Sequence, residues 1–221
     1  MIKIKNVARI YIAILLLMAF VIWTLAIRFV DVKAIGPNES SVGFATLNGF
    51  VHNLTGVHLS LYVITDWLGL VPIGFAMGFG LLGLIQWIQR RKLCKVDYNL
   101  FVLGGFYIVV FGAYLFFEAF AINYRPVLID GYLETSYPSS TTLLVLCVMP
   151  TAIMQLNSRI RNRTAVGVIR AAIVAFILFM VLGRLIAGVH WVTDIAGGGL
   201  LSAGLVEAYR FFVNIKTRTF V

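Results

Sequence analysis

The chain has 221 residues, of which 61% are hydrophobic and only 12% are charged, with a mean hydropathy of +0.95. A water-soluble domain of this length needs more polar surface than this composition provides. The composition therefore excludes an ordinary soluble enzyme and predicts an all-α, polytopic integral membrane protein. No linker, repeat or low-complexity tract divides residues 1–221, so we expect a single domain.

The first apolar run extends from Ile10 to about Val30 and follows three basic residues. It is long enough to span a bilayer and no signal-peptidase site follows it, so it predicts an uncleaved first helix. A polar break over 31–41 comes next. The stretch 44–54 then has apolar residues at helical spacing among polar ones, which suits a short interfacial helix and a packed loop about equally.

Five further apolar runs predict five more membrane helices, giving a six-transmembrane-helix bundle. Their expected bounds are His58–Ile88, Tyr98–Phe120, Ser139–Leu156, Thr164–Ile186 and His190–Val213.

The basic residues predict which side each loop faces. With six spans, fourteen of the eighteen Lys and Arg residues fall at the end of the bundle that holds both termini. Cytoplasmic loops carry such an excess, so we expect both termini to be cytoplasmic and the membrane to be a bacterial plasma membrane. The fourteen are Lys3, Lys5, Arg9, Arg90, Arg91, Lys92, Lys95, Arg159, Arg161, Arg163, Arg170, Arg210, Lys216 and Arg218.

The net charge of +9 is accordingly read as a topology signal with some attraction to anionic lipid head groups, and not as a nucleic-acid site, because the basic residues form short loop clusters. Cys94 lies in a basic loop and Cys147 inside an apolar run, so we expect two free cysteines at different depths and no disulfide.

Ionisable residues gather at the opposite, outward end of the predicted bundle. Charged groups at membrane depth are costly and usually face the bundle interior, where they mark a functional site. We therefore expect a polar pocket there, although Asp130 and Glu134 are read as solvated loop residues. The seven residues are Glu118, Arg125, Asp130, Glu134, Arg184, His190 and Asp194.

The most specific pattern among them is Gly183-Arg184-x5-His190-x3-Asp194. On a helix His190 and Asp194 share a face, so the carboxylate is expected to hydrogen-bond one ring nitrogen and leave the other as a nucleophile or base. The guanidinium of Arg184, just before this pair, suits bidentate binding of a phosphate.

Two weaker motifs precede it. Arg125 is followed by Pro126, and Pro138-Ser139-Ser140-Thr141 opens the fourth predicted span. A hydroxyl cap and free N–H groups at a helix start can bind an anion.

In this order on one side of six spans, the motifs resemble those of the type 2 phosphatidic acid phosphatase superfamily, K-x6-R-P, P-S-G-H and S-R-x5-H-x3-D. The resemblance implies a metal-free site without a cofactor, in which a histidine attacks phosphorus. Arg125 and Arg184 match the arginines that hold phosphate, and Ser139, with Ser140 beside it, matches the phosphate-binding start of the second motif. His190 matches the nucleophile and Asp194 the carboxylate that orients it.

Three positions depart from that pattern. Glu118 replaces the lysine of the first motif, Thr141 the histidine that protonates the leaving group, and Gly183 the serine of the third motif. Loss of a general acid typically costs a factor of about 10² to 10⁴. A phosphate leaving group, with a second pKa of about 6, needs that proton less than an alkoxide does. The sequence thus favours a polyprenyl diphosphate over a phosphatidate as the membrane lipid substrate.

Three alternatives remain open at this point. His52, His58 or a protonated Glu118 would restore a proton donor. The chain would otherwise be an inactive relative that binds phospholipid head groups. A transporter is disfavoured because the charges lie at one face and no pair of broken helices is evident.

Overall fold

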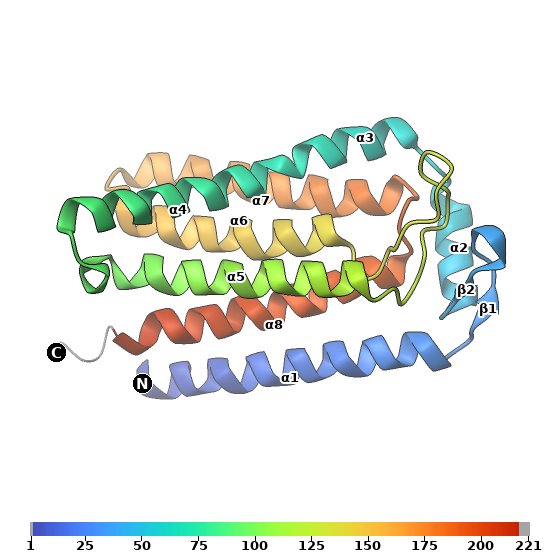
Figure 1. Ribbon diagram of the computed structural model, residues 1–221, viewed down its shortest axis with the longest axis horizontal. Helices are drawn as coiled ribbons and strands as arrows, with labels where there is room; N and C mark the ends of the chain where they lie inside the picture. The colour runs from blue at the N-terminus through green and yellow to red at the C-terminus, as the bar shows by residue number, and fades with distance from the viewer. Residues whose placement is uncertain (1, 217–221) are drawn as a thin grey trace.

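The computed structural model describes residues 2–216, and side chains from Asn6 to Ile215. Met1 and residues 217–221, which include Arg218 of the basic set, lie outside the described residues, as do the side chains of Lys3, Lys5 and Lys216. The described part is all-α apart from one short hairpin (Figure 1). The helices are α1 (Ile2–Phe29), α2 (Ala45–Thr55), α3 (Leu59–Leu68), α4 (Leu70–Arg90), α5 (Tyr98–Ala119), α6 (Ser140–Arg159), α7 (Arg163–Ile186) and α8 (Val192–Lys216).

Long helices run side by side along the whole molecule, as a bundle requires. Within the described residues, five helical segments are long and apolar enough to cross a membrane: α1 from Asn6, α3 with α4, α5, α6 and α7. The sixth long helix, α8, has 25 residues and packs against α1, α5 and α6. Because α8 packs mainly against other helices, it can include Gly197-Gly198-Gly199, Glu207 and Arg210, which make it less apolar than the five segments above. The all-α, polytopic prediction is confirmed.

Close contact between the first and last helices depends on a glycine. A Cβ at Gly204 of α8 would lie 2.8 Å from the side chain of Leu17 of α1, so any larger residue would force Leu17 to shift at this crossing. Near the start of α1 and the end of α8, which lie at the same end of the bundle, Arg9 donates a hydrogen bond to Glu207 over 3.2 Å. The two helices are thereby fixed along their length, which places the start of α8 firmly at the opposite end.

The helix bounds agree with the predicted spans to within a few residues, with two differences. The first helix begins well before Ile10, because the basic residues ahead of the apolar run continue it. The second span is divided at Gly69 into α3 and α4. Between the first two spans, the stretch 44–54 forms the short helix α2, so the packed-loop alternative is wrong.

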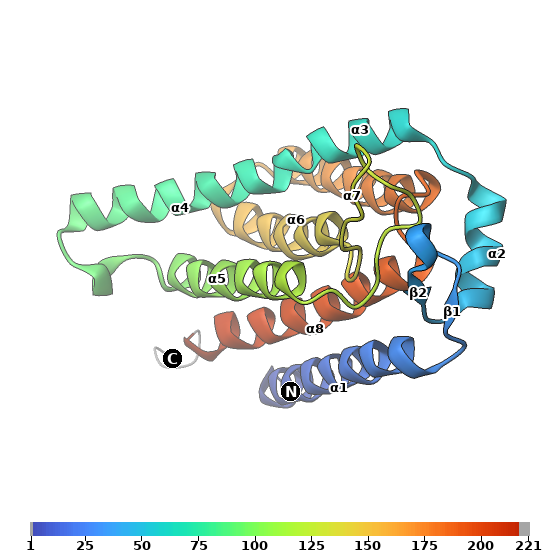
Figure 2. The same ribbon diagram turned by 45° about the vertical axis from the view of Figure 1, so that its right-hand side comes forward.

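One end of the bundle is closed by irregular structure. Strands β1 (Lys33–Ala34) and β2 (Ser41–Val42) form a two-residue antiparallel hairpin around the 3-10 turn η1 (Pro37–Glu39), and α2 follows it across the end of the helices (Figure 2). The long loop 120–139 folds over the same end. The side chain of Asn48 in α2 donates to the carbonyl of Gly43 and to Oγ1 of Thr193, which ties this layer to the first turn of α8.

The other end carries the basic loops. The 3-10 turn η2 (Leu93–Lys95) links α4 to α5, and Asp97 accepts hydrogen bonds from Gln86 and Arg90. These bonds join the two helices at this end. They also lower the pKa of Asp97, with the bond from Gln86 the largest cause and that from Arg90 next. Cys94 is exposed here and Cys147 is buried within α6, which confirms two free cysteines at different depths.

Candidate active site

Four of the predicted site residues meet beneath the loop 120–139. Arg125 comes from that loop, Arg184 from the last turn of α7, and His190 and Asp194 from the turn into α8. All four are buried, with exposed fractions of 8%, 1%, 4% and 0%. Two buried guanidiniums beside a buried imidazole are costly to assemble unless an anion joins them. The polar pocket expected from the sequence is therefore present.

The imidazole of His190 is oriented by a backbone carbonyl. Its Nδ1 lies 3.2 Å from the carbonyl oxygen of Ser136, which can only accept. Its Nε2 accepts from Nη1 of Arg125 at 3.4 Å and from Nη2 of Arg184 at 3.5 Å. The proton therefore resides on Nδ1, and the lone pair of Nε2 points between the two cations.

The surroundings of His190 also set its protonation state. Burial, followed by the charges of Arg125 and Arg184, lowers the pKa of His190 well below its usual value. The imidazole is neutral at neutral pH, and Nε2 is then available to attack an electrophile. A phosphate that binds between the two guanidiniums would meet this nitrogen directly.

The predicted hydrogen bond between the His190 ring and the Asp194 carboxylate is not formed. His190 precedes the first residue of α8, so the pair does not share a helical face, and Oδ2 of Asp194 lies 3.8 Å from Nδ1. The carboxylate instead accepts from the backbone N–H of Trp191 at 2.9 Å and from Asn123 at 3.4 Å. Asp194 thus holds the turn that presents His190 and lies near enough to stabilise a positive charge on the ring.

The start of α6 shows which serine faces the cleft. Ser139 is fully buried, caps the helix through bonds from the N–H and hydroxyl of Thr142, and donates its own N–H to the carbonyl of Asp194. Ser140 is partly exposed and lines the cleft with Arg125, Glu118 and His190. The hydroxyl predicted at Ser139 to bind phosphate is therefore engaged in the cap, and Ser140 is the serine that can reach a ligand.

Both arginines are paired with carboxylates that are more exposed than they are. Nε of Arg125 lies 3.0 Å from Glu134, and Nη1 of Arg184 lies 3.5 Å from Asp66. Glu134 is a loop residue with a side chain that is 42% exposed, as expected, but it also pairs with Arg125, and Asp130 lies in a turn at positive φ. Within the described residues, Nε of Arg184 is buried without a hydrogen-bond partner. Buried donors of this kind are free for an anion.

One face of α3 contributes three residues that the motif analysis did not include. The ring of Tyr62 lies under both guanidiniums, 5.7 Å from that of Arg125 and 5.1 Å from that of Arg184. Thr65 accepts from Arg184 at 3.4 Å, and Asp66 forms its ion pair. The spacing of these residues, i, i+3 and i+4, was the available signal. Nothing in the sequence linked Asp66 to Arg184.

The three departures occupy different places around the site. Glu118 is exposed and lines the cleft beside His190. Thr141 is not among the residues that line this cleft; it lines the adjoining, largely apolar cavity with Asp66 and Gly69. Gly183 packs so closely on α3 that a Cβ there would lie 2.9 Å from the methyl carbon of Thr65. The side chain of Thr65 therefore occupies space that a serine side chain at position 183 would need.

This contact predicts a rescue by a second substitution. Gly183→Ser should overpack the contact between α3 and α7 and destabilise the protein by about 1 to 3 kcal/mol. Thr65→Ser removes the methyl group and keeps the hydroxyl that faces Arg184. We therefore expect the double variant to regain most of the thermal stability that Gly183→Ser loses, as measured by unfolding in detergent. Equal losses in the single and double variants would contradict this packing.

Neither remaining histidine lines the cleft. His52 packs against the ring of Trp191 at 5.5 Å, and Nε2 of His58 bonds the carbonyl of Thr55. Of the three candidate proton donors, only Glu118 lies at the cleft. Among the described residues no group of three His, Cys, Asp or Glu side chains is placed to hold a metal ion.

The comparisons with known proteins bear on the fold. No family model matches the chain, and no curated protein matches it. A solved structure, the first transmembrane PAP2-type phosphatidylglycerolphosphate phosphatase from Bacillus subtilis, aligns over 95% of this chain and 98% of its own with a TM-score of 0.54. The identity is 17%. The resemblance to the type 2 phosphatidic acid phosphatases is therefore confirmed at the level of the fold.

Proposed function

We propose that a chain with this fold and this site hydrolyses a membrane lipid phosphate, through a covalent intermediate on His190. The observation that carries the proposal is the convergence of Arg125 and Arg184 on Nε2 of a neutral, buried imidazole. Two guanidiniums stabilise the charge of a transferring phosphoryl group, and the nitrogen between them is the only nucleophile at their focus in the described residues.

The geometry supports a two-step reaction. Nε2 forms a bond to phosphorus as the bond to the leaving oxygen breaks, and the proton on Nδ1 stays with the ring. The resulting phosphoimidazolium is stabilised by the carbonyl of Ser136 and by the Asp194 carboxylate, 3.8 Å away. Water then attacks phosphorus, the P–N bond breaks, and inorganic phosphate leaves with His190 neutral again. No step draws on a metal or cofactor.

A polyprenyl diphosphate is the favoured substrate. Thr141 and the placement of His52 and His58 leave no histidine that can protonate a leaving alkoxide. The leaving group of a diphosphate is itself a phosphate, which departs with little protonation. Phosphatidylglycerol phosphate, which the structural neighbour's name gives as that enzyme's substrate, would leave an alkoxide and should react more slowly here.

A head-group-binding protein without activity is the second candidate. Glu118 favours this candidate, because a carboxylate that lines the cleft of His190 repels phosphate. Thr141 also favours it, because the general acid is missing there.

A substrate panel separates the two candidates. We expect purified protein in detergent to release phosphate from undecaprenyl diphosphate, faster than from phosphatidate, and equally fast after EDTA. Binding of both lipids with no release would favour the second candidate, and a loss in EDTA restored by one divalent ion would overturn the metal-independent mechanism.

We also propose that the site faces outward from the plasma membrane, on the basis of the basic loops at the opposite end. Thiol labelling of the native protein can test this orientation, because Cys94 is exposed at that end and Cys147 is buried. An impermeant maleimide should label Cys94 only after permeabilisation of the cells. An Asp130→Cys, Cys94→Ser variant should be labelled without it. The reverse pattern would place the site in the cytoplasm.

A further inference from the structure

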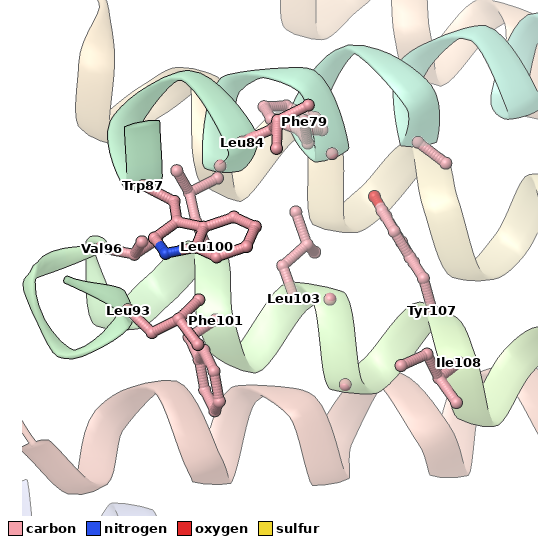
Figure 3. A pocket seen from close by; sticks show the side chains of 15 residues that line it. Phe79, Leu84, Trp87, Leu93, Val96, Leu100, Phe101, Leu103, Tyr107 and Ile108 are labelled. Carbon is pink, nitrogen blue, oxygen red and sulfur yellow. The ribbon is translucent and has the colours of Figure 1, made fainter. Parts of the chain in front are cut away.

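An apolar groove runs between α4 and α5, from the candidate site to the far end of the bundle. Its first half adjoins the site and is lined by Asp66, Gly69, Tyr114, Ser140 and Thr141 among apolar residues. Its second half lies toward η2 and ends between Trp87, Leu93 and Val96 (Figure 3). Ala76 and Tyr107 line both halves, so the two halves adjoin each other. We call the whole feature the chain groove.

The chain groove begins where a leaving group would point. Ser140 and Tyr114 line both the cleft around His190 and the first half of the groove. A phosphate held at His190 would therefore have its lipid side directed past Ser140 and Thr141 into the groove. The two halves hold about 520 Å³ and about 460 Å³ of space, enough for a segment of a hydrocarbon chain.

Small residues keep the second half open. Gly80 and Gly83 on α4 face Gly104 and Gly105 on α5, and a Cβ at any of the four would meet nothing within 4 Å. Glycine is unfavourable in a helix interior by roughly 1 kcal/mol relative to alanine, so four at one inter-helix gap need a reason. Glycines at membrane interfaces usually bring helices together. Here they border empty space instead.

The length of the groove points to its occupant. From Gly69 to Trp87 the helix rises roughly 27 Å, close to the full thickness of about 30 Å of a bilayer's hydrocarbon core. An acyl chain of one leaflet reaches about half of that depth, near Ala76 and Tyr107. A polyprenyl chain continues further. Resting on the proposed function, we propose that the second half of the chain groove binds the distal part of a long polyprenyl chain and selects long-chain lipid phosphates.

The surrounding lipid limits how strongly the chain groove can favour a long chain. Lipid tails are as apolar as the groove, so the chain gains contact and placement there, and no hydrophobic transfer energy. We therefore expect substitutions in the second half to change selectivity about three- to tenfold. They should leave reaction at His190 itself unaltered.

The test compares undecaprenyl diphosphate with farnesyl diphosphate, which has the same head group and a short chain. Gly83→Leu and Gly104→Leu fill the second half of the groove. Gly167→Leu on α7, where a Cβ also meets nothing within 4 Å, is the matched control. Both groove variants should lower kcat/KM for the long substrate about three- to tenfold relative to the short one, and the control should leave the ratio unchanged. An unchanged ratio in the groove variants would overturn the inference and leave the phosphatase proposal intact.

A second measurement does not depend on turnover. An undecaprenyl phosphate with a photoactivatable group at its far end should crosslink to residues 79–107, and a farnesyl phosphate with the same group should crosslink nearer the site, at residues 66–77. If the wild type hydrolyses neither substrate, the proposed function fails. The pattern of crosslinks then tests by itself whether the chain groove binds the long chain. Crosslinks of the long analogue spread over the other helices would contradict it.

Discussion

His190→Ala should abolish phosphate release from every lipid substrate. The reason is that Nε2 is the atom on which Arg125 and Arg184 converge, and none of the described side chains beside it offers another nucleophile. Loss of a covalent nucleophile leaves only what binding and charge stabilisation contribute. The measurement is phosphate release from undecaprenyl diphosphate by purified variants, with folding checked by thermal unfolding.

The matched control is His58→Ala, an exposed histidine at the same end whose ring bonds only the carbonyl of Thr55 among the described residues. It should keep wild-type activity. Asp194→Asn should lose most but not all activity, because the asparagine can still accept from Trp191 while its charge near the ring is gone. Phosphate release by His190→Ala above background would show that His190 is not the nucleophile.

Thr141→His should raise turnover of a lipid monophosphate far more than turnover of a diphosphate. Thr141 lines the groove beside Ser140, on the side where the lipid oxygen would leave, so an imidazole there can protonate an alkoxide. A positioned general acid is worth about 10² to 10⁴ in rate. We expect a gain of roughly tenfold or more for phosphatidate, held below that range because Glu118 still repels the substrate.

The ratio of kcat/KM for phosphatidate to that for undecaprenyl diphosphate is the quantity to compare in wild type and variant. Glu118→Lys combined with Thr141→His should gain more than either change alone. An unchanged ratio in a folded Thr141→His protein would remove the argument from the missing acid. The preference for diphosphates would then have no basis.

The membrane helices and the principal site residues could be predicted because their signals are local. About 20 apolar residues define a span, and Arg184, His190 and Asp194 lie within eleven residues of one another at its end. Arg125, 65 residues before His190, was placed through the resemblance, and the fold brings its guanidinium to the same nitrogen.

The remaining parts of the site depend on contacts that spacing does not encode. Because of the short turn before α8, His190 lies outside the helix, and its Nδ1 contacts the carbonyl of Ser136 and not the Asp194 carboxylate. A backbone carbonyl leaves no residue-type signal. The different roles of Ser139 and Ser140 follow from which of the two hydroxyls caps α6. The ion pair between Asp66 and Arg184 joins residues that are 118 positions apart in the sequence.

The most direct test of the central claim is capture of the covalent intermediate. Protein mixed with undecaprenyl diphosphate labelled at the terminal phosphate is denatured in alkali within one turnover, and its peptides are then mapped. The proposed mechanism predicts label on the peptide that contains His190, none in His190→Ala, and chase of the label by unlabelled substrate. Phosphate release at the normal rate with no label on His190 would contradict it.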